Sequence, residues 1–438
     1  MTHTDVLHLA EADEQNPSRG KTAQKPSIAV FYHYFPPSDV VSAAHFGDLC
    51  AGLVRRGWAV SAFPTTWDCR DESVQYPRSE EWQGVSVRRI WRPRFRQSSN
   101  LGRMINAVWM IAAWCAQAMR KPAPDVVLIG TDPILSILTA VFWRLIRPRT
   151  KIVHWCFDLY PEAAISDGLL RPDGIVTRAI RRLLDPAYRA CSLIVDIGPC
   201  MRGLLSKYPT KARRETLVPW ALDEPGDVKP PEVAERERLF PGAKLGLLYS
   251  GSFGRAHSYS DILRLADFLA HGGGCITFSV RGNREMELRA AVKESGSPVR
   301  FVPPVAADKL GERLASVDIH VVSLRPEWSG TVVPSKFFGA LAMGRPVLFS
   351  GPRSSSIAHW IQEHNIGWIL DSDRISEAGF ELLAYASDRG QQAAMQQRCF
   401  DVYRQQFSRA VQIDQWNSVL RGLMSSEPEM NLGHHDEE

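Results

Sequence analysis

The stretch at residues 331–351, TVVPSKFFGALAMGRPVLFSG, has the pattern of a loop, a short helix and a buried strand. Pro334 ends the preceding segment, Ser335 is a residue type that caps helices, and Gly344 stands where a helix C-terminus favours a left-handed residue. The VLF run at 347–349 then forms a short apolar strand. A helix that leads into a buried strand is the repeating unit of an α/β sheet.

The start of this helix is a candidate anion site. A helix that opens directly after a loop leaves backbone N–H groups without partners, and the positive end of the helix dipole lies behind them. Lys336 adds a full positive charge at the same place. The pattern also fits a buried α/β unit whose lysine only reaches toward water.

Four ordered segments of the chain resemble landmarks of one family. They are YFPPSDVVSAAHFGDLCAGLVRRGWAVSAF at 34–63, HWCFDLYPEAAISDG at 154–168, LLYSGSFGRAH at 247–257, and PSKFFGALAMGRPVLFSG at 334–351, which SSSIAHWIQEHNIGWIL follows. Together they are similar to bacterial glycosyltransferase family 4 enzymes, in particular to the exopolysaccharide and O-antigen branch with a Pro-Ser-Lys motif. The last two segments resemble the nucleotide-sugar half of these enzymes.

Bulk composition is that of an ordinary globular protein. The 438 residues suffice for two to three domains, and 45% of them are hydrophobic and 23% charged. The net charge of +4 is spread over both signs, so the charge pattern does not point to nucleic acid. The eight cysteines form no C-x-x-C pair, which favours free thiols over disulfides or zinc. Since no secretion signal opens the chain, we expect a cytoplasmic enzyme.

Apolar runs and helical patterns alternate through the first half of the chain. After a polar, aperiodic leader at 1–25, which we expect to be disordered, a domain spans 26–221. Its expected strands lie at 27–34, 58–63, 85–91, 125–129, 152–157 and 193–197. This alternation predicts a doubly wound parallel sheet, whose ligands bind beyond the carboxyl ends of the strands.

The second half repeats the pattern after a linker at 222–242 that is rich in proline and charge. A nucleotide-sugar domain is expected at 243–385, followed by helices at 386–424 that cross back onto the first domain and an acidic, disordered tail at 425–438. The expected strands of this domain lie at 245–249, 275–281, 299–302, 318–322, 347–349 and 367–370. The predicted fold class is therefore α/β, with two doubly wound Rossmann-like domains facing across a cleft, and the family resemblance implies the same GT-B architecture.

Polar side chains follow the strands of the first domain. His45 stands near the start of the first helix and beside its apolar stripe, so it is a candidate to face the cleft, although a histidine bonded to the backbone fits as well. The loops after the fourth and fifth strands carry Thr131 and Asp132, and Asp158 and Glu162. Carboxylates there can orient sugar hydroxyls, or they can serve in turns and caps. The resemblance implies that these five residues face the sugar and the acceptor.

The loop after residue 249 resembles the diphosphate-facing loop of the family. Gly251 and Gly254 allow close approach of a ligand to the backbone, and Arg255 offers a planar fork to phosphate. The family's usual lysine a few residues later is absent, and we expect Lys336, next to Ser335, to supply its charge.

The chain also departs from the family at its paired glutamates. Counting back from the Gly-Arg-Pro at 344–346 places the two positions at Thr331 and Gly339, and neither is acidic. Glu327 in the same loop is a candidate to replace one of them. The expected donor-binding set is Gly251, Gly254, Arg255, Glu327, Thr331, Ser335 and Lys336.

The resemblance implies transfer of a sugar from a nucleoside-diphosphate sugar with retention of configuration. No bound metal or other cofactor is expected, in line with the absence of an Asp-x-Asp motif in a suitable loop. Cationic groups aimed at the phosphates then stabilise the departing diphosphate, and closure of the domains excludes water.

The acceptor implied by the resemblance is a glycan or a polyprenyl-diphosphate-linked precursor. The apolar segment 104–116, at about 13 residues, is too short for the ~20 that span a bilayer. It fits either a buried helix or one that lies in a membrane surface, with arginines at 94, 96, 103 and 120 around it. A second basic stretch at 171–189 supports a membrane surface as a candidate partner, although solvated faces also carry such charges.

Two other functions fit the pattern. A non-catalytic subunit that keeps the fold would explain the missing glutamates. A sugar-nucleotide epimerase shares the architecture but needs carboxylates close to the phosphate loops. A nicotinamide oxidoreductase is disfavoured, since no strand is followed by the full dinucleotide fingerprint.

Overall fold

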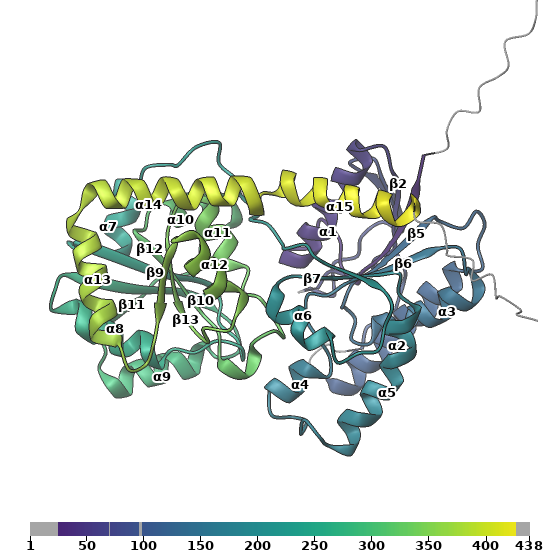
Figure 1. Ribbon diagram of the computed structural model, residues 1–438, viewed down its shortest axis with the longest axis horizontal. Coiled ribbons are helices and arrows are strands. Elements are labelled where there is room, and N and C mark those ends of the chain that lie inside the picture. Colours follow the sequence, from purple (N-terminus) through teal and green to yellow (C-terminus); the bar gives the residue numbers. More distant parts are fainter. Residues whose placement is uncertain (1–24, 70, 96–98, 426–438) are drawn as a thin grey trace, which may run out of the picture.

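The computed structural model describes residues 25–69, 71–95 and 99–425. Apart from residues 25 and 425, the expected leader and acidic tail lie outside these described residues. Within them the chain forms two mainly parallel sheets, each in its own domain and covered by helices on both faces (Figure 1). The predicted α/β fold of two doubly wound domains is confirmed.

The first domain holds the larger sheet, with strand order β3-β4-β2-β1-β5-β6-β7-β8. All neighbouring strands are parallel except β3 and β4. At the centre, Ile28 of β1 lies opposite Val60 on one side and Val126 on the other. The strands are β1 (Ser27–Phe31), β2 (Ala59–Ala62), β3 (Ser79–Trp82), β4 (Val85–Arg88), β5 (Val126–Ile129), β6 (Lys151–Trp155), β7 (Leu193–Asp196) and β8 (Arg213–Thr216).

Helices of the first domain pack on both faces of this sheet. β5 is a VVLI run in which every side chain is buried, as expected for a parallel strand covered on both faces. The helical elements are α1 (Val41–Arg55), α2 (Asn100–Gln117), η1 (Ser136–Leu138), α3 (Thr139–Ile146), α4 (Glu162–Ser166), α5 (Ile175–Ala190) and α6 (Pro199–Leu205).

The second domain holds the smaller sheet, with strand order β11-β10-β9-β12-β13-β14. Its strands are β9 (Leu245–Ser252), β10 (Gly274–Arg281), β11 (Val299–Phe301), β12 (Ile319–Ser323), β13 (Val347–Ser350) and β14 (Gly367–Leu370). Its helical elements are α7 (Val233–Leu239), α8 (Ser260–Ala270), α9 (Glu285–Ser295), α10 (Ala307–Ala315), η2 (Pro326–Trp328), α11 (Lys336–Ala342), α12 (Ser356–His364) and α13 (Ile375–Ser387).

Two strands and one helix were not anticipated from the sequence. β3 (SEEW) and β8 (RRET) are the two edges of the first sheet, and neither has an apolar run that would mark it as a strand. Polar edge strands are common, because an edge faces solvent and charged side chains there discourage pairing with other chains. The expected linker contains α7, so only part of it is irregular.

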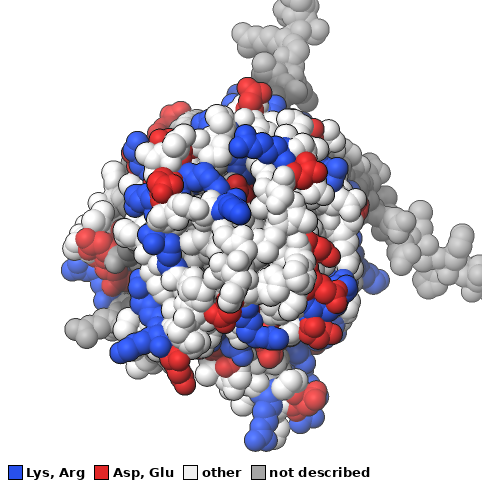
Figure 2. Space-filling model, turned by 90° about the vertical axis from the view of Figure 1, so that its left-hand side faces the viewer, with Lys and Arg blue, Asp and Glu red and all other residues white. Residues whose placement is uncertain are grey.

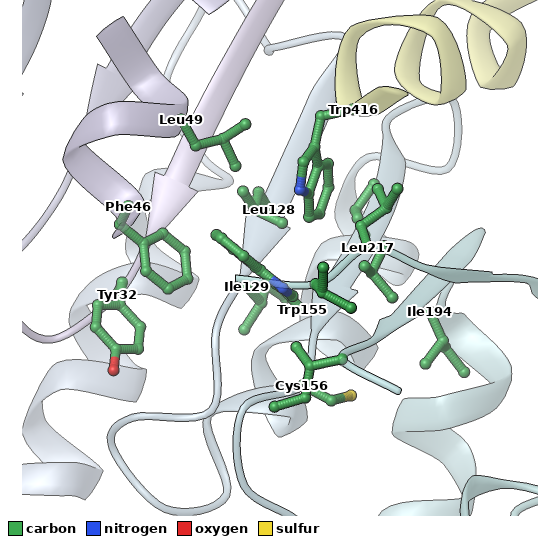
Figure 3. Packing of buried hydrophobic residues seen from close by; sticks show 14 of the residues in the cluster. Tyr32, Phe46, Leu49, Leu128, Ile129, Trp155, Cys156, Ile194, Leu217 and Trp416 are labelled. Atoms are coloured by element: carbon green, nitrogen blue, oxygen red, sulfur yellow. The ribbon is translucent and has the colours of Figure 1, made fainter. Parts of the chain in front are cut away.

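The C-terminal helices run along the second domain and end on the first (Figure 1). The helices expected at 386–424 are α14 (Arg389–Val402) and α15 (Arg409–Ser425), which a π-helical turn (Tyr403–Phe407) joins. Figure 3 shows Trp416 of α15 lying over Trp155, with the ring centroids 5.0 Å apart. Gly52 of α1 faces Ile413 so closely that a Cβ there would lie 2.6 Å from the isoleucine Cγ2. The last helix therefore completes the core of the first domain.

The helix that contains the apolar segment 104–116 extends beyond this segment at both ends. α2 has 18 residues, and its N-cap Ser99 accepts a hydrogen bond from the backbone N–H of Gly102. Among the described residues, no helix combines the length and apolar character needed to cross a bilayer.

Candidate active site between the two domains

A cavity of about 240 Å³ lies between the two domains, at the carboxyl ends of strands from both sheets. It brings together four of the residues singled out in the sequence: His45 from the first domain, and Gly251, Ser335 and Lys336 from the second. Other lining residues include Trp220, Asp223, Arg281, His320, Gly339 and Met343. Gly339 is the position where the family pattern has a glutamate, so the cavity keeps the location of that site without its carboxylate.

Lys336 is the enclosed cation of this cavity, whereas the other cation in its lining, Arg281, is exposed. Part of the Lys336 side chain reaches the surface, but its amine end is enclosed: Nζ lies 5.3 Å from the Tyr249 ring centroid and 3.3 Å from Nε2 of His257. This enclosure lowers the pKa of Lys336 to about 8. Within the described part of the chain, no carboxylate lies within ion-pair distance of Lys336. An enclosed cation without a counter-ion is a suitable partner for an anionic ligand.

Gly251 lies next to the side chain of Lys336. The glycine has φ +108°, a conformation that L side chains rarely adopt, and a Cβ there would lie 3.4 Å from Cε of Lys336. The positive φ therefore favours glycine at this position of β9, and a Cβ there would be in ordinary contact with the lysine.

His257 was not singled out from the sequence. Its Nδ1 accepts a hydrogen bond from the backbone N–H of Gly254 at 2.9 Å, and its ring stacks on Phe253 with centroids 5.7 Å apart. Burial, followed by the charge of Lys336, lowers the pKa of His257 to about 3. The sequence does contain a signal that could have identified it: a histidine two positions after Arg255, in the expected phosphate loop.

His45 lies on the opposite wall of the cavity and is fully buried. Its Nε2 lies 2.9 Å from the carbonyl oxygen of Trp220, so this nitrogen carries the proton. Burial lowers the pKa of His45, and no described residue bonds its Nδ1. His45 therefore both lines the cleft and bonds to the backbone, the two roles that the sequence left as alternatives.

Arg255, Glu327 and Thr331 lie at a contact between the domains and do not line the cavity. Arg255 forms an ion pair with Asp167, which follows α4 of the first domain. Ser166 donates to the carbonyl oxygen of Glu327 at 2.6 Å and lies 3.2 Å from Oγ1 of Thr331. The Glu327 carboxylate lies 3.5 Å from Arg325. The diphosphate and sugar contacts expected of these three residues stay predictions.

Asp132 and Asp158 stand near each other in the first domain. Asp132 contacts Nδ1 of the buried His33 at 3.3 Å. Asp158 is exposed at the surface, but the protein that surrounds its carboxyl, and then the charge of Asp132, raise the pKa of this group to about 6. Thr131 and Asp158 line a separate cavity of about 20 Å³. The structure thus groups these residues with one another and not with Lys336.

Glu162 is accounted for by contacts within the first domain. Its carboxylate accepts hydrogen bonds from the hydroxyl of Tyr208 at 2.9 and 3.1 Å and pairs with Arg181 at 3.3 Å. The side chain is buried, so its expected role toward the acceptor has no support from these contacts.

Two features of the Pro-Ser-Lys segment were tested directly. Gly344 has φ +66° just after α11, as expected for a helix end. The expectation that Ser335 caps this helix was wrong: its side chain makes no capping bond, because residue 335 already has helical φ and ψ.

Residues 42–221 match the family model for the glycosyl transferase 4-like domain. Over 257 residues the chain is 28% identical to the probable glycosyltransferase WbjE of Pseudomonas aeruginosa, a match that covers 56% of this chain and 62% of that protein. The match therefore spans less than two thirds of that relative.

Solved structures share the fold over nearly the whole chain. Sucrose-phosphate synthase from Thermosynechococcus elongatus has a TM-score of 0.69 at 14% identity, and the match covers 92% of this chain and 100% of that one. WaaG, a glycosyltransferase involved in lipopolysaccharide biosynthesis, has a TM-score of 0.60 at 15% identity, with 90% and 100% covered. HepE of Anabaena, solved in complex with UDP and glucose, has a TM-score of 0.60 at 14% identity, with 91% and 100% covered. The chain thus has the GT-B fold, and residues 42–221 of its first domain match the glycosyl transferase 4-like domain.

Proposed function

We propose that the protein is a retaining glycosyltransferase that moves a sugar from a nucleoside-diphosphate sugar to a glycan or a polyprenyl-diphosphate-linked acceptor. The family match of residues 42–221 and the GT-B fold support the reaction class. The relation to WbjE and the likeness to WaaG support a role in surface-polysaccharide assembly on the cytoplasmic face of the membrane.

The observation that carries the proposal is the enclosed Lys336 in the cavity between the domains. In the transfer, the bond from the anomeric carbon to the β-phosphate oxygen breaks and its electron pair goes to that oxygen. The acceptor oxygen then bonds to the anomeric carbon and gives its proton to the departing diphosphate. A fixed cation in a cavity shielded from water stabilises the charge that develops on the diphosphate more strongly than solvent does.

Nucleotide binding gives the first test. Thermal unfolding is measured with UDP, ADP, GDP and their sugars, with and without EDTA, since no metal is expected to be needed. One nucleotide should raise Tm in the native protein. Lys336→Ala should abolish this shift, whereas Lys293→Ala on the exposed face of α9 should keep it.

Turnover then separates the enzyme from the alternatives. Release of the nucleoside diphosphate in the presence of a lipid-linked acceptor, with the α or β configuration of the product matching that of the donor, supports the proposal. Binding without release would favour the non-catalytic subunit, and conversion of one sugar nucleotide into another would favour the epimerase. A native protein that no nucleotide stabilises would overturn the donor site.

A membrane surface is the second part of the proposal. Along α2, the side chains of Leu101, Met104 and Val108 are 71%, 51% and 59% exposed, and on α5 those of Ile175 and Leu183 are 79% and 52% exposed. α3 lies between these two helices and packs on both. Exposed arginines accompany the apolar side chains on α2 and α5, at 103, 178 and 182. Apolar side chains flanked by arginines fit the headgroup region of an anionic bilayer.

The opposite end of the molecule has a different surface. Figure 2 shows the face of the second domain, on which lysines and arginines are interspersed with aspartates and glutamates. The mixed charge of this face supports a membrane-facing role for the first domain, which is also where the acceptor is expected to bind.

Vesicle flotation tests this surface. The protein should float with vesicles of phosphatidylcholine and phosphatidylglycerol and less with phosphatidylcholine alone. Ile175→Gln should reduce the bound fraction several-fold, because it removes apolar area from the interface. Val233→Gln is the matched control, since Val233 is also 79% exposed but belongs to α7 of the second domain. Equal loss in both variants would contradict the assignment.

A further inference from the structure

His257 is held in one protonation state by its backbone neighbour. The N–H of Gly254 can only donate, so Nδ1 of His257, at 2.9 Å, presents a lone pair. A neutral imidazole with a lone pair on Nδ1 carries its proton on Nε2. Lys336 and Arg284 are the charged groups that act on this ring, and both disfavour a second proton.

The Nε2–H of His257 and the ammonium of Lys336 face each other with 3.3 Å between the nitrogens. A charged lysine has three donors and no acceptor, so neither group can accept from the other. Two donors directed at one place leave both unsatisfied until an acceptor comes between or beside them. An oxygen of a phosphate, with several lone pairs and a negative charge, satisfies both.

The ring is fixed in this position. It stacks on Phe253, meets the Tyr249 ring edge-on with centroids 6.1 Å apart, and its own carbonyl oxygen accepts from Arg284 at 2.7 Å. The loop that carries it directly follows β9, whose residue Gly251 lies beside Lys336. Little conformational freedom is then lost when a ligand binds, which favours affinity.

We propose that His257, as a neutral Nε2–H donor, binds a diphosphate oxygen of the sugar donor together with Lys336. This inference rests on the proposed function and names a residue that completes its phosphate site. The histidine thus supplies the second donor that the loop lacks in the absence of a lysine.

Paired nucleotides test the role. Isothermal titration measures the affinities for UDP and UMP, for ADP and AMP, and for GDP and GMP. It compares the native protein with His257→Ala and His257→Gln. Because the proposed hydrogen bond is to a charged group, His257→Ala should bind the diphosphate with an affinity about 10- to 100-fold lower. The monophosphate should lose less than about threefold, and His257→Gln, whose amide also donates, should recover most of the affinity.

The outcomes separate the two proposals. If no diphosphate binds the native protein, the proposed function fails and this inference with it. If the native protein binds and His257→Ala binds equally well, only the inference fails. If both nucleotides weaken equally and glutamine does not restore binding, His257 has a structural role and the inference is overturned.

A measurement on the ligand-free protein gives an independent check. Nitrogen-15 NMR of the histidine rings should show His257 neutral, with the proton on Nε2, between pH 5 and 8. A ring that becomes doubly protonated in this range, or that carries its proton on Nδ1, would contradict the inference. This result does not depend on which nucleotide the protein prefers.

Discussion

The enclosure of Lys336 in the cavity has two opposed effects on this side chain. Lys336 needs enclosure to interact strongly with a diphosphate, and the same enclosure lowers its pKa to about 8. The neutral lysine can accept the Nε2–H of His257, which then competes with the ligand. The protonated lysine cannot do so. The charge state of one residue therefore decides whether the phosphate site is ready for its ligand.

The affinity for a nucleoside diphosphate should fall as the pH rises. Because the free-state pKa of Lys336 lies near 8, its ammonium is mostly present at pH 7 and mostly lost at pH 9. Loss of one required proton weakens binding by up to about tenfold over this range. Titration calorimetry at several pH values measures the slope. Lys336→Arg, which stays charged, should give a nearly flat profile, and an unchanged slope in this variant would assign the effect to another group.

Whole elements show where the sequence predicted the structure and where it could not. Central strands such as β5 are continuous apolar runs, so pattern alone located them. The edge strands β3 and β8 are polar, and their pairing depends on neighbours distant in sequence. Likewise, Lys336 and Gly251 were predicted because local motifs mark them. The contacts of Arg255 with Asp167 and of Glu162 with Tyr208 join residues far apart in the chain, which no local pattern reveals.

The packing of α1 against α15 makes a prediction at this scale. Gly52→Ala would place a Cβ 2.6 Å from the Ile413 side chain and force the two helices apart. Overpacking of this kind costs about 1–3 kcal/mol, measured as a lower midpoint of urea unfolding. Trimming the partner removes the crowding atoms Cγ2 and Cδ1, so Gly52→Ala with Ile413→Ala should be less destabilised than the sum of the two changes. Strict additivity would show that the two residues do not contact each other in solution.

At the scale of the molecule, a set of polar contacts beside the cavity joins the two domains, in addition to apolar packing between them. The ion pair of Arg255 with Asp167 is the charged member of this set, and Ser166 adds bonds to the loop that precedes α11. If Arg255 also serves the donor diphosphate, as the sequence predicts, it must exchange one anionic partner for another. Domain closure and donor binding are then linked through a single guanidinium.

Asp167→Asn tests this link. Removing the competing carboxylate should strengthen binding of the nucleoside diphosphate up to about fivefold, the range expected for a partly exposed ion pair. Arg255→Ala should weaken binding, and the double variant should resemble Arg255→Ala. Titration calorimetry of the three variants measures this. Equal weakening by Asp167→Asn and Arg255→Ala would instead assign the pair to holding the domains together.

The path of α15 has a consequence for how the protein can be divided. Since the last helix returns to the first domain and covers Trp155 with Trp416, the second domain is topologically an insertion within the first. A fragment that stops at residue 221 would leave this part of the first domain's core open to water. The two ends of the described chain lie on the same domain. The unit that can be excised or replaced is therefore the inserted second domain, and not either half of the sequence.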